Sequence, residues 1–222
     1  MRSTATPAAA GRLPLLYPLR TLDESRVAVH ELPHHRLRLT IDHEPLTGLT
    51  PDMLLWWFRN IGGTMPYAGR DVPRYRVWHP RDHIAWALAR PAPGGGAGEG
   101  ARFHIVENFG GDPAMHVDTV DRVEKLDRTG IRLVLRIAGV PLFQLEHTWS
   151  AGRGRVHYVS VLDLGGRSAL SAPVNRYLRA RVFTPGMERA WLRHNVEEVG
   201  LLEHFLPDLY AAHHPGAVTA AP

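Results

Sequence analysis

The sequence predicts an α+β fold, in which a curved antiparallel sheet surrounds a long C-terminal helix and encloses a ligand cavity. Two patterns carry this prediction. Residues 74–163 alternate between apolar and polar side chains with short breaks, as the strands of an antiparallel meander do. Residues 187–205 instead place apolar side chains at helical spacing. A sheet curved around a helix offers a sheltered site for a small molecule.

The first helix is expected directly after residue 50. Thr50 is a typical N-cap residue, Pro51 suits the first helical position, and Asp52 adds an acidic side chain to the first turn. Residues 53–58 (MLLWWF) then supply the apolar side chains that would bury this helix. A short helix is therefore predicted before the sheet.

The sheet is predicted from six segments that Gly, Pro or Asp-rich breaks separate. These segments lie near residues 74–90, 101–109, 115–126, 131–138, 141–149 and 154–164. The breaks are too short for crossover helices, so neighbouring strands should run antiparallel. Residues 91–100 (PAPGGGAGEG) can only form a flexible loop.

The C-terminal helix and the chain ends complete the organisation. Residues 187–205 form the predicted helix, and Pro207 is expected to end it. Residues 1–12 and 211–222 lack periodicity, which predicts a disordered N-terminus and a flexible tail. Residues 13–210 then form a single domain, whose portion 13–60 contributes an N-terminal strand and the first helix.

The composition excludes several classes of protein. Cysteine is absent, which rules out disulfide scaffolds, thiol nucleophiles and Cys-based zinc sites, and leaves His and carboxylate ligands for a metal. The net charge is +4, and the arginines are scattered instead of forming a basic stripe, so no nucleic-acid partner is expected. No targeting or membrane segment is visible, which favours a cytoplasmic protein without membrane contact.

His194 and Glu198 form the first candidate ligand pair. Four residues apart on the predicted C-terminal helix, their side chains share one face and can reach one ion. A solvated polar face explains the same spacing, and the neighbouring Arg193 and Glu197 are consistent with it. Taken alone, the pair favours the solvated face.

Three further side chains are expected to point into the cup. Strand alternation places Glu107 among Phe103 and Ile105, where an unpaired carboxylate would be costly. The same alternation turns His147 and Tyr158 inward. Structural roles, or for Glu107 a strand end turned to solvent, remain the alternatives.

His79 and His83 form a second histidine pair, in the segment RYRVWHPRDHI. Their even separation would place both side chains on one side of a regular strand, but Pro80 is expected to disturb it. Spacing alone does not choose between them.

Residues 42–84 resemble the 2,4-diacetylphloroglucinol hydrolase family, which includes phloretin hydrolase. The distinctive segments are GLTPDMLLWWF and YRVWHPRDHI. The strand with an inward Glu, the HTW strand and the HNVEE helix follow in the order of the family. The resemblance therefore extends over residues 38–207.

The resemblance implies a fold, an activity and a metal site. Members of the family are metal-dependent hydrolases with a Bet v 1-like helix-grip fold, and they cleave the carbon–carbon bond between an aromatic polyol and an acyl group. Their zinc ion is held by two His and two Glu. The matching residues, for one Zn²⁺ per chain, are His83, Glu107, His194 and Glu198. The choice of His83 over His79 comes from this resemblance.

The resemblance also implies residues around a phenolic or polyketide substrate. Tyr75, His147 and Tyr158 stand near positions that the family uses around the substrate, and we expect them to be catalytic, with His147 or a tyrosine as the proton donor. Trp86 stands where the family has an asparagine, and we assign it to the substrate together with His79. The chain is shorter than the family at its N-terminus, where the family carries structure associated with dimers, and a homodimer is a possible assembly.

Two other functions fit the same fold. One is a metal-dependent cyclase or lyase that acts on a polyketide-like intermediate, for which the replacement of asparagine by Trp86 leaves room. The other is a non-catalytic protein that binds a small molecule in the cup.

Overall fold

The structure is a computed structural model that describes residues 12–215. Residues 1–11 of the predicted disordered N-terminus and residues 216–222 of the predicted tail lie outside the described residues. Within residues 12–215, no helix is both long enough and apolar enough to cross a membrane.

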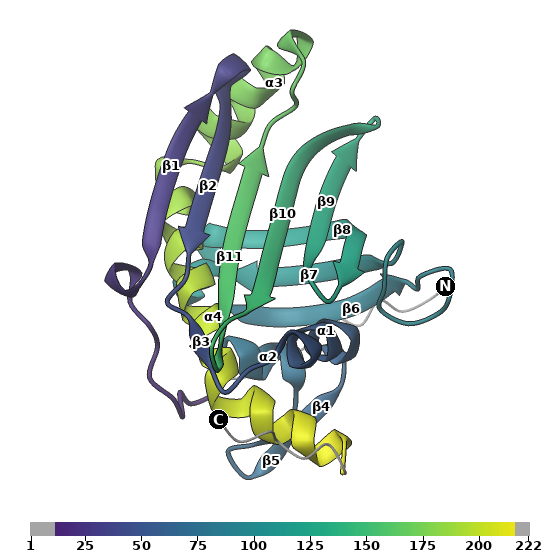
Figure 1. The fold of residues 1–222 in the computed structure, drawn as a ribbon. Helices are drawn as coiled ribbons and strands as arrows, with labels where there is room; N and C mark the ends of the chain where they lie inside the picture. Colours follow the sequence, from purple (N-terminus) through teal and green to yellow (C-terminus); the bar gives the residue numbers. More distant parts are fainter. Residues whose placement is uncertain (1–11, 216–222) are drawn as a thin grey trace, which may run out of the picture.

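A large antiparallel sheet is the main element of the fold (Figure 1). Its strand order is β1-β2-β11-β10-β9-β8-β7-β6, and a short strand β3 pairs with β11. The strands are β1 (Arg26–Leu32), β2 (Arg36–Asp42), β3 (Leu46–Thr47), β6 (His83–Arg90), β7 (Arg102–Asn108), β8 (His116–Asp127), β9 (Gly130–Ile137), β10 (Val140–Ala151) and β11 (Arg155–Leu164). In Figure 1, β6, β7 and β8 run across the direction of β9, β10 and β11, so the sheet is strongly curved. A separate hairpin is formed by β4 (Thr64–Tyr67) and β5 (Arg70–Pro73).

Four α-helices within residues 12–215 accompany the sheet. They are α1 (Pro51–Asn60), α2 (Arg74–Trp78), α3 (Ala172–Tyr177) and α4 (Pro185–His213). A short π-helical turn, Leu178–Val182, follows α3. The long α4 packs against α1, β2 and β3, and it buries Trp191, Val199 and Phe205 among other side chains. A curved antiparallel sheet around a long C-terminal helix confirms the predicted helix-grip architecture.

The predicted beginning of α1 is confirmed. The hydroxyl of Thr50 accepts a hydrogen bond from the backbone N–H of Met53 at 3.3 Å, and Pro51 occupies the first helical position. The helix buries Met53, Leu54, Trp57 and Phe58. The ring of Phe58 stacks on that of Trp149, 5.6 Å away, and so joins α1 to β10.

The prediction of one strand over residues 74–90 is wrong. Residues 74–78 form α2, and β6 begins only at His83. Tyr75, Val77 and Trp78 are all buried in this helix. Their packing against the core therefore overrides the strand preference of these side chains. Residues 79–82 form the turn that leads into β6.

The prediction that Pro207 ends the last helix is also wrong. The helix α4 continues to His213, with Pro207 inside it, so residues 211–213 belong to α4 and not to a tail. Proline removes one backbone donor, but packing beyond it outweighs this loss. Leu209 is buried, and the ring of Trp56 on α1 lies 5.6 Å from that of Tyr210 and 5.0 Å from that of His213.

Candidate metal centre

Four side chains from β6, β7 and α4 converge on one point of the interior. His83 and Glu107 are direct partners in the register of β6 and β7, so their side chains lie next to each other. His194 and Glu198 are four residues apart on α4 and share a face. The structure thus brings together the four residues that the resemblance implied as metal ligands.

The distances between the ligand atoms match a metal site. Nε2 of His83 lies 3.4 Å from Oε1 of Glu107 and 3.4 Å from Oε2 of Glu198. Nε2 of His194 lies 3.8 Å from Oε2 of Glu107 and 3.8 Å from Oε2 of Glu198. With bonds of about 2.0–2.1 Å, neighbouring ligands of a tetrahedral zinc ion lie roughly 3.3–3.4 Å apart.

One ring nitrogen at this point has no partner. Nε2 of His83 is buried and makes no hydrogen bond within the described residues. A buried polar atom without a partner is costly unless something else binds it. Two imidazoles and two carboxylates are a donor set that zinc accepts, and the carboxylates offset its charge. The residues present therefore fit a zinc ion.

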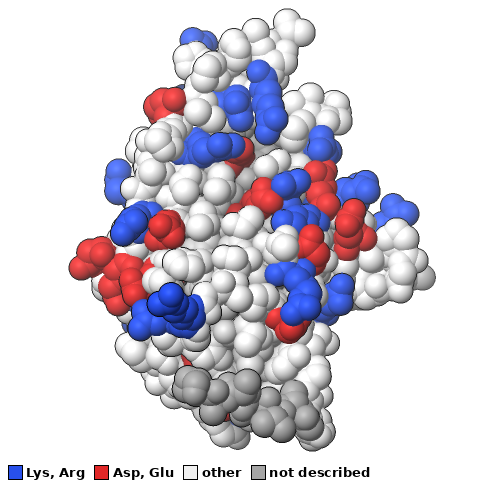
Figure 2. Space-filling view, in the orientation of Figure 1, with Lys and Arg blue, Asp and Glu red and all other residues white. Residues whose placement is uncertain are grey.

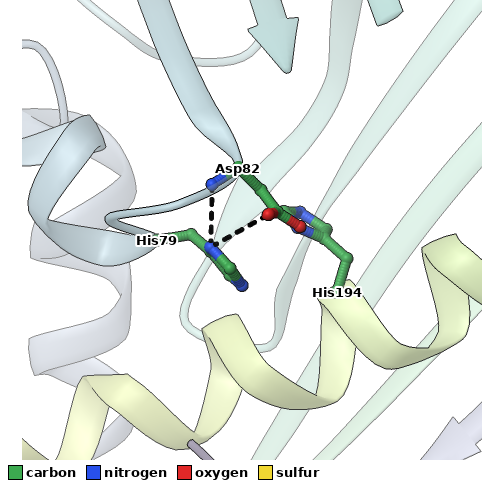
Figure 3. Close-up of side chains that lie close together, drawn as sticks. All are labelled: His79, Asp82 and His194. Carbon is green, nitrogen blue, oxygen red and sulfur yellow. Dashed lines mark hydrogen bonds and ion pairs between the residues drawn. The ribbon is translucent and has the colours of Figure 1, made fainter. Parts of the chain in front are cut away.

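Both histidines are oriented through their other ring nitrogen. Nδ1 of His83 donates to the backbone carbonyl of Tyr75 at 2.7 Å. Nδ1 of His194 lies 3.0 Å from Oδ2 of Asp82, which comes from the turn before β6 (Figure 3). This arrangement directs Nε2 of each ring to the common point, as the outer partners of metal-binding histidines do.

His79, Asp82 and His194 form a second group of side chains that lie close enough together to bind a metal ion. Both ring nitrogens of His79, however, already have hydrogen-bond partners. Its Nδ1 accepts a hydrogen bond from the backbone N–H of Asp82 at 3.1 Å, and its Nε2 lies 3.0 Å from Glu197. The ring is fully buried, so no polar atom is left for the substrate contact that the sequence analysis assigned to it. His79 holds the turn that carries Asp82 instead.

The two carboxylates of the centre are fixed by neighbours. The hydroxyl of Tyr75 donates to Oε1 of Glu107, and the Tyr75 ring stacks on the His83 ring at 4.0 Å. The side-chain amide of Asn195 donates to Oε1 of Glu198 at 2.6 Å, which leaves Oε2 facing both histidines. Tyr75, a predicted catalytic residue, thus lies directly beside the ligands.

Burial and neighbouring charges shift the pKa values of the ligands in opposite directions. Burial, together with His194, lowers the pKa of His83 well below its usual value. Burial also acts to lower the pKa of His194, but Glu198 and Asp82 outweigh it and raise this pKa to about 9. Burial raises the pKa of Glu198 to about 8. A group of buried carboxylates around two imidazoles is an environment that attracts a cation.

His147 and Tyr158 lie together on the neighbouring strands β10 and β11. Their ring centroids are 5.4 Å apart, and both side chains are buried as predicted. Burial, then the charge of His194, lowers the pKa of His147 to about 3, so its ring is neutral at ordinary pH. Burial and Glu198 raise the pKa of Tyr158, whose hydroxyl has no hydrogen-bond partner within the described residues.

A chain of hydrogen bonds leads outward from His147. The hydroxyl of Ser160 lies 2.9 Å from Nδ1 of His147 and 2.8 Å from Nε2 of His43. All three side chains are buried, and His43 also borders a surface hollow of about 330 Å³. The single hydroxyl of Ser160 thus links the two imidazoles, and because it carries one proton it can donate to only one of them.

Trp86 lies on β6, beyond a register shift between His83 and Ala85. Its ring packs edge-on against Phe103 with the centroids 5.0 Å apart, and it leaves no room for a side chain at Gly62. Its indole nitrogen is buried without a partner within residues 12–215. The predicted substrate role of Trp86 stays a prediction.

Sequence reasoning missed two buried carboxylates. Asp82 is fully buried, and its Oδ2 also accepts from the backbone N–H of Gly110 at 2.8 Å. Asp121 on β8 is 2% exposed, and burial raises its pKa to about 6. Alternation with Thr119 and Val123 was the available signal for Asp121, whereas Asp82 lies in a turn that has no periodicity.

Access to the centre is narrow. The side chain of Glu107 is 13% exposed, whereas that of His83 is fully enclosed. A second surface hollow, of about 360 Å³, is formed by Arg90, Pro91, Ala92, Pro93, Gly100 and Arg122. Neither this hollow nor the one beside His43 is lined by a ligand of the centre.

No protein-family model and no curated protein matches the chain. Among solved structures, Ara h 8.0201 has 10% identity and a TM-score of 0.44, over 79% of this chain and 99% of its own. CalU16 from Micromonospora echinospora has 10% identity and a TM-score of 0.38, over 80% and 97%. A protein from Rhodobacter sphaeroides has 11% identity and a TM-score of 0.45, over 83% and 99%.

Proposed function

We propose that the chain is a zinc-dependent hydrolase, similar to the 2,4-diacetylphloroglucinol hydrolase family. It would cleave the carbon–carbon bond between an acyl group and a phloroglucinol-like ring or β-diketone unit. The observation that carries the proposal is the convergence of His83, Glu107, His194 and Glu198, with ligand atoms 3.4–3.8 Å apart that form no hydrogen bonds with one another.

The reaction adds the elements of water across the aryl–acyl bond. The ring carbon takes a proton, the acyl carbon takes a hydroxide, and the products are the shorter phenol and a carboxylic acid. A zinc ion held by the four ligands would polarise a carbonyl oxygen and lower the pKa of a water molecule.

Tyr158 is the proton donor in this proposal. Its pKa is raised, so the phenol keeps its proton, and its hydroxyl is free of other partners within the described residues. The hydroxyl of Tyr75 is committed to Glu107. His147 is held neutral by burial, so it is poorly suited to donate as an imidazolium. Its role is to orient the substrate next to Tyr158.

Metal content tests the centre. Purified protein should carry about one zinc ion per chain, and His194→Ala and Glu198→Ala should each lose most of it. His204→Ala is the matched control, because His204 lies on the same helix but is exposed. Unchanged zinc content in the two ligand variants would refute the assignment.

Product release tests the reaction. The zinc-loaded protein is incubated with mono- and diacylphloroglucinols and with acyclic β-diketones, and the released carboxylic acid is measured. Tyr158→Phe should retain zinc and lose activity by about 10²-fold or more. Zinc binding without acid release from any compound would favour a cyclase or lyase. Tight binding of the compounds without any turnover would favour a carrier.

A further inference from the structure

The segment that joins β11 to α4 exposes several apolar side chains. Leu170 is 91% exposed, Tyr177 62%, Val182 51% and Val174 46%. Contiguous exposed apolar side chains on a globular protein commonly mark a contact surface. In Figure 1 this segment, with α3, lies at the upper end of the molecule, next to the turn between β1 and β2.

These side chains point outward because the opposite side of α3 is fixed to the sheet. The side chain of Asn175 is fully buried. Its amide donates to the carbonyls of His34 at 2.8 Å and Gly166 at 2.9 Å, and its oxygen accepts from the N–H of Gly166 at 2.8 Å. Leu170, Val174 and Tyr177 follow at intervals of four and three residues, and so share the outer face.

The charge of the segment is entirely positive. Residues 164–187 contain four arginines and no acidic residue. Arg179 pairs with Glu31 at 2.8 Å, but Arg167, Arg176 and Arg181 are exposed and form no ion pair with any described residue. Among the charged side chains at the upper end of the molecule in Figure 2, most are basic.

We propose that residues 167–182 dock this protein on the surface of an anionic lipid bilayer. Leu170, Val174 and Tyr177 would enter the interfacial region, and the unpaired arginines would contact lipid phosphates. Apolar side chains surrounded by arginine are the combination that such surfaces bind. A peripheral contact of this kind needs no membrane-spanning helix, and it is independent of the proposed hydrolase activity.

Two other occupants fit less well. A symmetric dimer through this face would bring its unpaired arginines against those of the second copy, and like charges repel. A nucleic acid would match the charge, but it would leave Leu170 and Val182 without an apolar partner.

Vesicle sedimentation tests the proposal. Full-length protein should sediment with phosphatidylcholine vesicles that contain phosphatidylserine, much less with pure phosphatidylcholine, and less as salt rises. The variant Leu170→Ser/Tyr177→Ser should bind the vesicles at least about tenfold more weakly. Arg176→Gln/Arg181→Gln should bind roughly fivefold more weakly for each arginine removed.

The control is Ile137→Ser, which removes an apolar side chain that is 58% exposed on β9. It should bind as the unchanged protein does, and all variants should unfold at the same urea concentration because the replaced side chains are exposed. Absence of vesicle binding, or equal binding by the Leu170/Tyr177 variant, would overturn the proposal. Self-association that the same variant abolishes, or binding to duplex DNA in preference to vesicles, would overturn it as well.

Discussion

Single residues decide how tightly the centre can hold an ion. Asp82 contacts His194 through the ring nitrogen that faces away from the ligand cluster. Such a partner fixes the ring and strengthens it as a ligand. The Asp82 carboxylate also raises the pKa of His194. It therefore acts on the ring through its negative charge as well as by fixing the orientation of the ring.

Asp82→Asn should weaken zinc affinity by about 10–100-fold, because the ring of His194 loses its charged acceptor. Competition with a chromogenic chelator measures this change. Asp118→Asn is the control, since the carboxylate of Asp118 forms an exposed pair with His104 at 2.8 Å instead of contacting His194. Equal zinc affinities in the two variants would show that Asp82 does not support the metal centre.

The buried histidines make stability depend on pH. Burial lowers the pKa of both His43 and His147 to about 3, whereas an unfolded histidine has a pKa of about 6.5. Below pH 6.5 the unfolded chain therefore binds protons that the folded chain does not, and stability falls as pH falls toward 3.

Urea unfolding at pH 7 and pH 5 should show this loss, at about 1 kcal/mol per pH unit for each histidine. The variant His43→Gln/His147→Gln should lose less stability over the same interval. His204→Gln should keep the full dependence, because His204 is exposed. An unchanged dependence in the double variant would show that other groups cause it.

The sequence predicted part of the centre on physical grounds. Helical spacing paired His194 with Glu198, and strand alternation turned Glu107 inward. The choice of His83 over His79 needed the family resemblance, because the residues of the turn before β6 follow neither the helical nor the strand periodicity. The role of Asp82 could not be predicted for the same reason, since no periodicity indicates where a side chain in a turn will point.

At the scale of elements, strong local signals predicted the right structure and tertiary contacts explain the errors. The capping residues of α1 fixed its beginning, and the meander from β7 to β11 follows the predicted segments. The five-residue α2 has no helical signal of its own, and burial of its aromatic side chains maintains it. The hairpin of β1 and β2 was not predicted in detail. The side chains of β1 are mostly exposed, whereas β2 buries every second side chain.

The turn after α1 controls a side chain of β6. A Cβ atom at Gly62 would lie 2.4 Å from the ring of Trp86. Gly62→Ala should therefore displace this indole and destabilise the fold by about 1–3 kcal/mol. Urea unfolding and the near-ultraviolet circular dichroism of tryptophan measure the effect. Gly94→Ala should be neutral, because no atom lies within 4 Å of its Cβ position.

At the scale of the whole molecule, the centre joins two parts of the core. Trp191 and Val196 of α4 pack with side chains of β2 and β11. Val199 and Phe205 pack in a second cluster, with side chains of α1. His194 lies within the first of these stretches and Glu198 directly before the second, so a bound ion would tie both clusters to β6 and β7.

Zinc should consequently stabilise the entire fold. At a free zinc concentration one hundred times the dissociation constant, binding adds about 2.7 kcal/mol to the free energy of unfolding. For a chain of this length, Tm should rise by about 5–10 °C, as measured by scanning calorimetry. Glu198→Ala should show almost no rise, and an equal rise in that variant would place the zinc elsewhere.

The positions of the four proposed ligands in the sequence also determine when during synthesis each of them becomes available. His83 and Glu107 leave the ribosome long before α4 does, and two ligands alone hold zinc weakly. A zinc ion held by all four residues would be captured only after α4 has docked on the sheet. Loading with metal would then be a late step, which would distinguish finished molecules from nascent ones.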